Sequence, residues 1–398
     1  ANCRAVSKKR IDIHGVVSIR FKIVGIKNES VITDAEGDGI QLRKKKIGTD
    51  NVAAVVMKKF QLSQTEEADG GEIGKIFYAC ASPVLSETKI IKGKILLKGE
   101  AVLKVMYCSA TGENESVCVN YNLPFSEIID IESIDDSCKV SVGFNVDQVQ
   151  AEPKTDNDGE YKYLNLGCDI CAVVTAYKTE DICVITDSYS TQKEIDAKYK
   201  TETFTQILQN LNDSIICRES VDLSSMNPQR IYAAIAQSPE AKSRFDADKM
   251  TVTGKIPLKF ILIDGEGTPT FCEREAEFEY SRSIDAKGGN LHCDPKLFLT
   301  GYSCTLTSDG RAEFKAEMNI SADITETSEC RTLVSLKTME NSELKKRHSS
   351  LVICFCNGGE KIWDIARKYN TTVEDIMSEN ELTSDEIGEK MMLMIPVK

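Results

Sequence analysis

The sequence predicts a mainly β protein, with tandem antiparallel β-rich repeat domains followed by a small β-α-α-β module. Three observations predict this fold class. Apolar residues alternate with period two over most of residues 10 to 340, as they do in half-buried strands. Two stretches of the chain recur roughly 155 residues further on. After residue 350 the apolar period changes to that of a helix.

The composition is that of a globular protein and argues against nucleic acid as a partner. The 398 residues exceed one ordinary hydrophobic core and predict two to four domains of roughly 100 to 200 residues each. Lys and Arg number 49 against 62 Asp and Glu, so the formal charge of −13 would repel a polyphosphate. No apolar run approaches the roughly 18 to 20 residues that cross a bilayer, so we expect no membrane span.

The 15 cysteines indicate reduced thiols in a reducing cytosol, because their number is odd and many lie in apolar strand-like runs. Cys108, Cys118 and Cys183 are examples that we expect to pack as small hydrophobic groups. Cys168 and Cys171 have the CxxC spacing, but on a strand they point to opposite faces. We therefore interpret them as packed thiols.

No metal site and no cofactor are expected. Cys354 and Cys356 share a strand face, yet the chain has only three histidines and none is spaced as a partner ligand.

The body of the chain consists of strands separated by turn signals. One strand is predicted where Ala101, Leu103, Val105 and Tyr107 alternate with more polar neighbours, which makes it half-buried with Lys104 on its outer face. Turn dipeptides and tripeptides separate the strands at Asp38-Gly39, Gly70-Gly71, Asn157-Asp158-Gly159, Asp264-Gly265, Gly288-Gly289 and Asp309-Gly310.

Two echoes indicate an internal repeat. The segment from Gly99 to Val105 recurs from Gly254 to Phe260 with the same parity of apolar positions. The tetrapeptide Val-Ile-Thr-Asp occurs at residues 31–34 and again at 184–187. Alternation alone can make β-sheet sequences resemble one another, but two separate echoes at nearly one period are harder to obtain by chance.

The echoes and the small, polar segments between them predict the domain boundaries. Residues 1–68 are predicted to be the C-terminal half of a β-rich repeat that has lost its front half, 72–224 a complete repeat, 228–340 a further repeat, 341–350 an exposed linker and 351–398 the terminal module.

The terminal module is predicted to run strand, helix, helix, strand. Residues 351–356 read as a strand, and Ile362, Ile365, Ala366 and Tyr369 lie on one helical face. Thr372 is a plausible N-cap for a second helix, and residues 391–396 close the module with a strand.

These residues resemble a LysM domain. The motifs are Gly359-Glu360, Ile362-Trp363, Ile365-Ala366-Arg367-Lys368-Tyr369, Thr372-Val373-Glu374-Asp375-Ile376, Asn380-Glu381-Leu382 and Leu393-Met394-Ile395-Pro396. The resemblance implies a shallow groove that binds N-acetylglucosamine-containing glycans, or here a protein. By position it would use Gly359, Glu360, Lys361 and Ile362 from the first loop, and Leu382, Thr383, Ser384, Asp385 and Ile387 from the second. Trp363 is expected to be a core or partial core residue of the module.

The whole architecture resembles SipL-like spore-coat morphogenesis proteins of endospore-forming bacteria, in which repeats of a β-rich domain of unknown function precede a LysM domain. The opening residues 3–15, the segment 121–126 and the terminal module carry this resemblance. It implies a cytoplasmic scaffold in the mother cell, at the forespore surface, that binds a coat basement-layer ATPase through its LysM domain.

No enzymatic function is predicted, and no catalytic residues are proposed. The sequence has no P-loop, no GxGxxG after a strand, no GxSxG and no HExxH. Two functions therefore compete. One is a non-enzymatic scaffold or adaptor in coat assembly that acts through protein–protein interaction, and the other is a cell-wall protein whose LysM domain binds peptidoglycan.

Overall fold

The computed structural model describes residues 2–7, 10–16, 30–69, 71–110, 116–246, 248–284, 290–344 and 351–397, and the chain divides into two compact units, residues 1–30 and 31–398. The first unit contains an antiparallel hairpin of β1 (Asn2–Ser7) and β2 (Arg10–His14). All remaining elements belong to the second unit and form antiparallel sheets and a small helical module, which confirms the predicted mainly β fold class.

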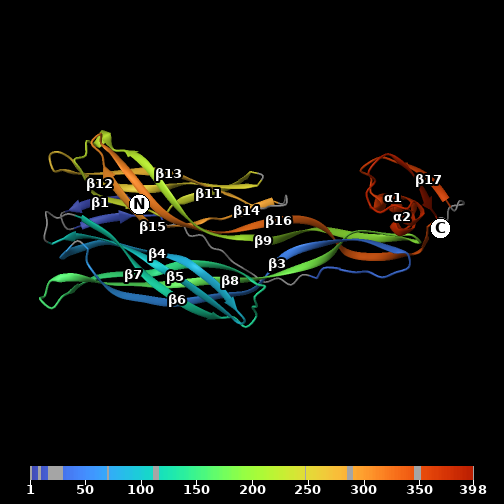
Figure 1. Ribbon diagram of the computed structural model, residues 1–398, viewed down its shortest axis with the longest axis horizontal. Coiled ribbons are helices and arrows are strands. Elements are labelled where there is room, and N and C mark those ends of the chain that lie inside the picture. Colours follow the sequence, from blue (N-terminus) through green and yellow to red (C-terminus); the bar gives the residue numbers. More distant parts are fainter. Residues whose placement is uncertain are drawn as a thin grey trace. The chain divides into compact units, whose positions relative to one another are not determined.

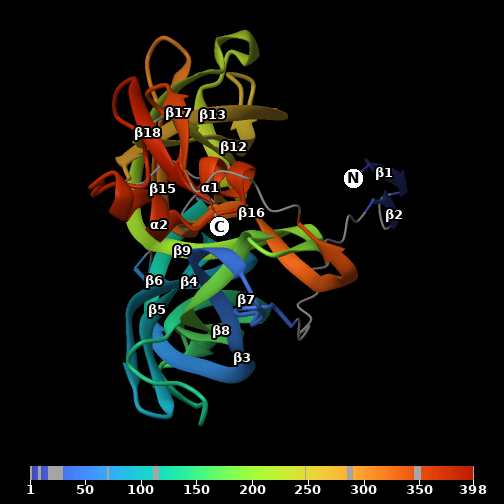
Figure 2. The ribbon, with the colours of Figure 1, turned by 90° about the vertical axis from the view of Figure 1, so that its right-hand side faces the viewer.

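The first β-sandwich consists of two antiparallel sheets (Figures 1 and 2). One contains β4 (Ile73–Ile91), β5 (Lys94–Ser109) and β6 (Ser116–Asp130), and the other contains β3 (Ile40–Glu67), β8 (Tyr161–Ser190) and β7 (Lys139–Thr155). Apolar residues on alternate positions of both sheets meet in the core, as the period-two pattern predicts. The fully buried members on β5 and β8 include Ala101, Leu103, Val105, Tyr107, Leu164, Leu166 and Ile170.

The second β-sandwich has the same two-sheet plan. Its first sheet contains β10 (Arg230–Ala236), β11 (Glu240–Asp246), β12 (Lys249–Ile263) and β13 (Pro269–Ser283). Its second sheet contains β14 (Asn290–Cys293), β15 (Lys296–Leu306), β16 (Arg311–Glu343) and β9 (Lys193–Asp222). A short 3-10 helix over Ser224–Met226 links β9 to β10.

A glycine–phenylalanine pair occurs at the same place in both sandwiches. Gly99 of β5 lies opposite Phe125 of β6, and Gly254 of β12 lies opposite Phe278 of β13. A Cβ added at Gly99 would lie 2.7 Å from the Phe125 ring, and one at Gly254 would lie 2.5 Å from the Phe278 ring. Each glycine therefore leaves room for an aromatic ring across the strand pair.

The sheets join pieces that the sequence analysis placed in separate domains. β3 falls in the predicted 1–68 piece but pairs with β8, and β9 falls in the predicted 72–224 repeat but pairs with β16. Strand pairing thus groups residues 40–190 and residues 193–343. The sequence echoes give the period of the repeat but not its starting point, so they could not predict these limits. The sheets therefore cross the boundaries predicted at residues 68–72 and 224–228. As limits of domains, those boundaries stay a prediction.

The structure also bears on the tetrapeptide echo and on the predicted linker. Val184–Asp187 lies within β8, whereas residues 31–34 are not in a strand, so the tetrapeptide echo does not mark equivalent strands. The predicted linker begins as part of β16, and the amide of Leu344 donates to the carbonyl of Gln192 at 2.9 Å. Residues 17–29 and 345–350 lie outside the described residues.

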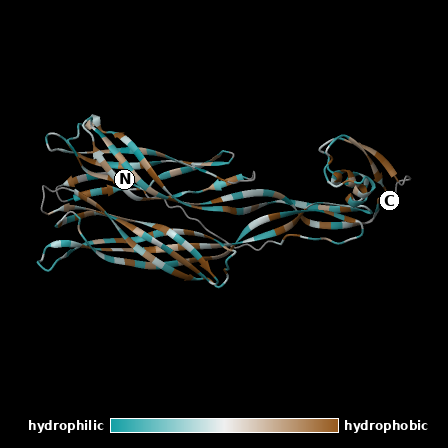
Figure 3. Cartoon of the chain, viewed as in Figure 1, coloured by the Kyte–Doolittle hydropathy of each residue, from teal (hydrophilic) through white to brown (hydrophobic). Residues whose placement is uncertain are grey.

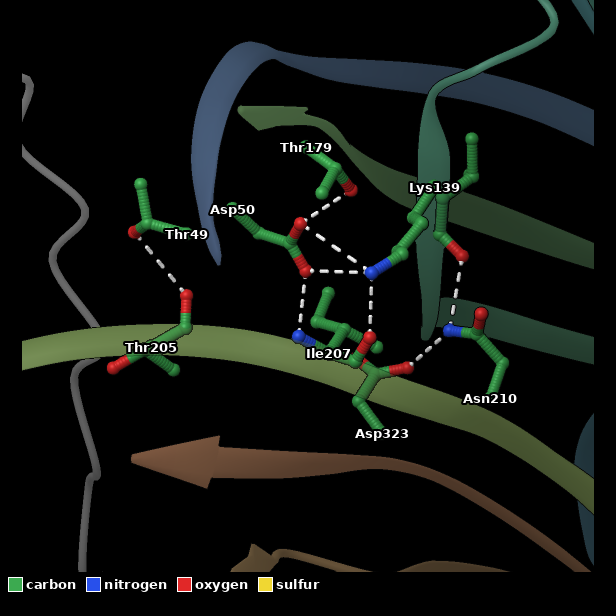
Figure 4. A network of polar contacts seen from close by, with 9 residues as sticks. Thr49, Asp50, Lys139, Thr179, Thr205, Ile207, Asn210 and Asp323 are labelled. Carbon is green, nitrogen blue, oxygen red and sulfur yellow. Dashed lines mark hydrogen bonds and ion pairs between the residues drawn. The ribbon is translucent and has the colours of Figure 1, made fainter. Parts of the chain in front are cut away.

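A buried carboxylate joins strands of the two sandwiches (Figure 4). Asp50 of β3 has a side chain only 2% exposed and accepts from Lys139 of β7 at 3.0 Å and from Thr179 of β8 at 2.5 Å. The Ile207 amide of β9 also donates to it at 2.5 Å, next to a register shift in the pairing of β9 with β16. The shift frees this amide from the ladder, so that the carboxylate is fully hydrogen-bonded.

β5 is buried on both faces, so the expectation of a half-buried strand was wrong. Residues 101–107 are all buried, because the second sandwich covers the outer face of β5. Lys104, expected at the surface, is only 6% exposed. Contacts between the sandwiches include a hydrogen bond from the side-chain amide of Asn212 on β9 to the Leu85 carbonyl of β4, at 2.7 Å.

The cysteines are free thiols throughout the part of the chain whose side chains the structure describes. Cys168 belongs to the core of the first sandwich, and Cys171 is buried outside that cluster, as expected for opposite strand faces. Cys118 and Cys183 are exposed, however, so the expectation that these two pack as small hydrophobic groups was wrong. Cys118 alternates with Val117 and Val119, and Cys183 alternates with Ile182 and Val184. Because those valines and isoleucine pack against the core clusters, the two thiols point the other way.

Candidate functional site: the terminal module

The terminal module has the predicted order of elements. It consists of β17 (Leu351–Cys356), α1 (Ile362–Tyr369), α2 (Val373–Glu379) and β18 (Met391–Pro396), with β17 and β18 antiparallel. The Thr372 hydroxyl accepts from the Asp375 amide at 3.0 Å, which confirms the predicted N-cap. The inner face of the strands and both helices share one core, which includes Cys356, Ile362, Ile365, Ala366, Ile376, Ile387, Leu393 and Ile395.

The two loops predicted to form the groove lie side by side. The Gly359 amide donates to the Ile387 carbonyl at 2.7 Å, and the Ile387 amide donates to the Glu360 carbonyl at 2.9 Å. The Ile362 amide donates to the Asp385 carbonyl at 2.8 Å, and Lys361 forms an isolated β-bridge with Glu386. Backbone hydrogen bonds therefore occupy the facing edges of the two loops.

The predicted groove residues divide into exposed and buried sets. Ile362 is fully buried and Ile387 is 3% exposed, so both side chains belong to the core and neither can line a surface groove. Leu382 is half-buried against that core. The remaining predicted residues are exposed, namely Gly359, Glu360, Lys361, Thr383, Ser384 and Asp385.

Trp363 contacts the C-terminal end of β8. Its indole nitrogen donates to the carboxylate of Asp187 at 2.9 Å, and its ring packs edge-on against Tyr189 with centroids 4.9 Å apart. Arg367 donates to the same carboxylate at 2.8 Å, and the Tyr189 hydroxyl donates to the Thr371 carbonyl at 2.7 Å. Burial raises the pKa of the Tyr189 hydroxyl, which is thus a neutral donor. Trp363 therefore packs both in the core of the module and against the end of β8, in keeping with its predicted partial core role.

The outer face of the β17–β18 sheet is apolar and exposed (Figure 3). Phe355 is 74% exposed and pairs with Met392 across the strands, and Ile353 is 57% exposed and pairs with Met394. Leu351 completes the face at 44% exposed. Sequence reasoning missed this surface, although its signal was visible, because every residue of β17 is apolar while a two-stranded sheet can bury only one face.

Cys354 and Cys356 lie on one strand face, with their sulfur atoms 3.7 Å apart, as their spacing predicts. Burial raises the pKa of Cys356 to about 12, so its thiol is protonated at neutral pH. In the described part of the chain, no group of three or more His, Cys, Asp and Glu side chains is placed to hold a metal ion. None of the helices among those residues is long and apolar enough to cross a membrane.

Antiparallel β-sandwiches followed by a β-α-α-β module define the class of this protein, a chain of modules whose last member has the LysM architecture. Comparison with protein-family models identifies a SipL SPOCS domain at residues 72–154 and a LysM domain at residues 359–396. In its domain content the chain is therefore SipL-like, and both matched domains are of non-catalytic, binding types. Neither the comparison with curated proteins nor that with solved structures gave a match.

Proposed function

We propose that this protein is a non-enzymatic adaptor in endospore coat assembly, which binds a coat basement-layer protein through its LysM domain. By resemblance, that partner is the basement-layer ATPase, and the site of action is the mother-cell cytoplasm at the forespore surface. The SipL SPOCS and LysM matches support a sporulation-related adaptor. The free thiols of the described cysteines are compatible with a reducing compartment.

The observation that supports a protein as the ligand is the exposed apolar face of the β17–β18 sheet. Its five side chains (Leu351, Ile353, Phe355, Met392, Met394) offer no hydrogen-bonding group, whereas an N-acetylglucosamine chain needs polar partners for its hydroxyl and amide groups. Methionine and phenylalanine together form an adaptable apolar surface of the kind that receives the apolar stripe of an amphipathic helix. We therefore assign this face to such a segment of the partner protein.

Phe355→Asp tests this assignment. Phe355 is 74% exposed, so a charge there should leave the module folded. It should weaken binding of purified basement-layer ATPase by about 30-fold, equivalent to about 2 kcal/mol. The measurement is biolayer interferometry with the full chain. Ile387→Asp is unsuitable as a probe, because Ile387 is a core residue.

Thr383→Asp is the matched control, since it places the same charge on the exposed groove loop. Equal loss of ATPase binding in both variants, or no loss in Phe355→Asp, would contradict the assignment to the β17–β18 face.

Peptidoglycan binding is the second candidate, and the LysM match itself favours it. Under this alternative the protein is located at the cell wall. A soluble N-acetylglucosamine oligomer should then bind wild type and Phe355→Asp alike and bind Thr383→Asp less well. Binding of the oligomer without binding of the ATPase would replace the adaptor proposal with this one.

A further inference from the structure

The inner face of the β17–β18 sheet brings three sulfur-bearing side chains together. Cys354 and Cys356 share one face of β17, and the thiol of Cys356 donates to the sulfur of Cys354 at 3.7 Å. Met391 lies directly opposite Cys356 on β18. Directly paired residues of an antiparallel sheet point to the same face, with their Cβ atoms about 5 Å apart. The register therefore places Met391 on the same face as the two thiols and next to Cys356.

The three side chains lie at the rim of the module core. Cys356 is fully buried, whereas Cys354 and Met391 are half-buried. Both half-buried side chains pack against the core cluster that contains Cys356. An ion arriving from solvent would therefore meet Cys354 and Met391 first, and Cys356 lies directly behind them.

Two thiols and a thioether are soft ligands, and soft ligands select the metal. Such sulfur ligands favour Cu(I), which is satisfied by two or three of them. Zn(II) is almost always held by four ligands in structural sites, and carboxylates suit harder ions. In the described part of the chain, no His, Asp or Glu joins these cysteines in a group of three or more. The ligand set therefore fits Cu(I) and lacks what zinc needs.

Binding of a metal ion here must displace protons, because a cysteine ligates as the thiolate. Burial raises the pKa of Cys356 to about 12, so its free thiol is protonated at neutral pH. A bound metal ion deprotonates a coordinating thiol outright, so the raised pKa makes the affinity depend on pH without preventing binding. The charged side chains that act on Cys356 are Glu360 of the first loop and Lys368 of α1, which have opposite signs.

We propose that Cys354, Cys356 and Met391 form a binding site for Cu(I), with two thiolates and one thioether as its ligands. The ion ties β17 to β18 and stabilises the terminal module, because a ligand that binds only the folded state adds to its stability. The site lies on the inner face of the sheet, opposite the apolar face that contains Phe355 and Met392. It is thus independent of the adaptor function proposed above.

The test measures the Cu(I) affinity of the full chain by competition with bicinchoninate, under anaerobic conditions and with less Cu(I) than protein. The low Cu(I) level is needed because the chain has 15 cysteines, and the other thiols would take up any excess. Wild type is compared with Cys354→Ser and Met391→Leu. Both variants change half-buried side chains and nearly keep their volume, so they should fold. Cys118→Ser is the matched control, since it removes an exposed thiol of β6.

We expect Cys354→Ser to lose about 100-fold or more in affinity, because even loss of a group that only supports a ligand costs about 10- to 100-fold. Met391→Leu should lose about tenfold, in keeping with a weaker thioether ligand, and Cys118→Ser should bind as wild type does. X-ray absorption of the wild-type complex should show sulfur ligands only, with one fewer in Met391→Leu. Hydrogen exchange of residues 351–356 and 391–396 should slow when Cu(I) binds, and the affinity should rise with pH.

Equal affinity of wild type and Cys354→Ser would overturn the proposal, since the first ion would then bind to other thiols. Unchanged affinity and ligand number in Met391→Leu would contradict the three-ligand site. Zn(II) bound as tightly as Cu(I), with the same loss in Cys354→Ser, would refute the assignment to a soft monovalent ion.

Discussion

Corresponding lysines in the two sandwiches have opposite environments. Lys104 of β5 and Lys259 of β12 occupy the same place in the echoed segments that begin at Gly99 and Gly254. Lys259 has a side chain 38% exposed and lies 3.6 Å from the carboxylate of Glu273 on the neighbouring strand. Lys104 is 6% exposed and lies against Tyr302 without a carboxylate.

The difference shows that position on a strand does not determine burial in a multidomain chain. Both lysines lie on the outer face of their own sandwich, where alternation predicts contact with water. The second sandwich covers that face in the first repeat, whereas the outer face around Lys259 is only partly covered. The burial of Lys104 is therefore a product of domain association.

The largest expected effect concerns the network that links the sandwiches at Asp50. Asp50→Ala removes a carboxylate that is 2% exposed. The amide of Ile207 then loses this acceptor, and the ammonium of Lys139 loses its counter-charge but keeps its hydrogen bond to the Ile207 carbonyl. We expect a loss of about 3 to 5 kcal/mol in the free energy of unfolding, measured by chemical denaturation. Hydrogen exchange of the Ile207 amide should also become faster.

Asp181→Ala is the control for Asp50→Ala. Its ion pair with Lys46 is at the surface, where the two side chains are 56% and 71% exposed, so the loss of stability should be far smaller than for Asp50→Ala. Similar costs for the two variants would show that the buried network does not hold the sandwiches together.

The next largest expected effect is a difference in stability between variants of Lys104 and of Lys259. The pKa of Lys104 is about 8 in the folded chain against 10.5 for an unperturbed lysine, so its charge destabilises the fold at pH 7 by on the order of 3 kcal/mol. Lys104→Met should therefore raise the free energy of unfolding at pH 7 by an amount of this order. Lys259→Met should change it by less than about 1 kcal/mol, because Lys259 is partly solvated.

The lowered pKa of Lys104 also fixes the direction in which stability should change with pH. Between about pH 8 and 10.5 the unfolded chain binds more protons at Lys104 than the folded chain does, so the contribution of this group to stability rises with pH. The advantage of Lys104→Met over wild type should consequently shrink across that interval in denaturation curves at stepped pH. A constant difference from pH 7 to 10.5 would show that Lys104 titrates normally.

Local pattern was enough to predict the fold class and the elements of the LysM domain. Period-two alternation, turn glycines and the Thr372 cap each depend on neighbours close in sequence. The buried state of Lys104 and the contact of Trp363 with Asp187 depend on pairs of domains, which alternation does not encode. The two loops named in the groove prediction lie side by side, but the sequence pattern could not show that the side chain of Ile387 is buried in the core.

The smallest effect tests what the two sandwiches share. Gly99→Ala and Gly254→Ala each place a methyl group against a phenylalanine ring and a carbonyl oxygen of the neighbouring strand, those of Val84 and Glu240 respectively. Backbone atoms cannot move aside as a flexible side chain can, so each variant should lose about 1 to 3 kcal/mol, as overpacked cores do. Thermal unfolding of the two variants and of Gly93→Ala provides the measurement.

Gly93→Ala is the control. At Gly93 a methyl group would meet nothing within 4 Å, but the φ of +77° at this residue favours glycine, so its loss of stability reflects backbone strain alone. If Gly99→Ala and Gly254→Ala cost no more than Gly93→Ala, the glycine–phenylalanine pair would not be a packing requirement of the repeat. A large cost in one sandwich alone would indicate that the two repeats share a sequence pattern and not a common way of packing.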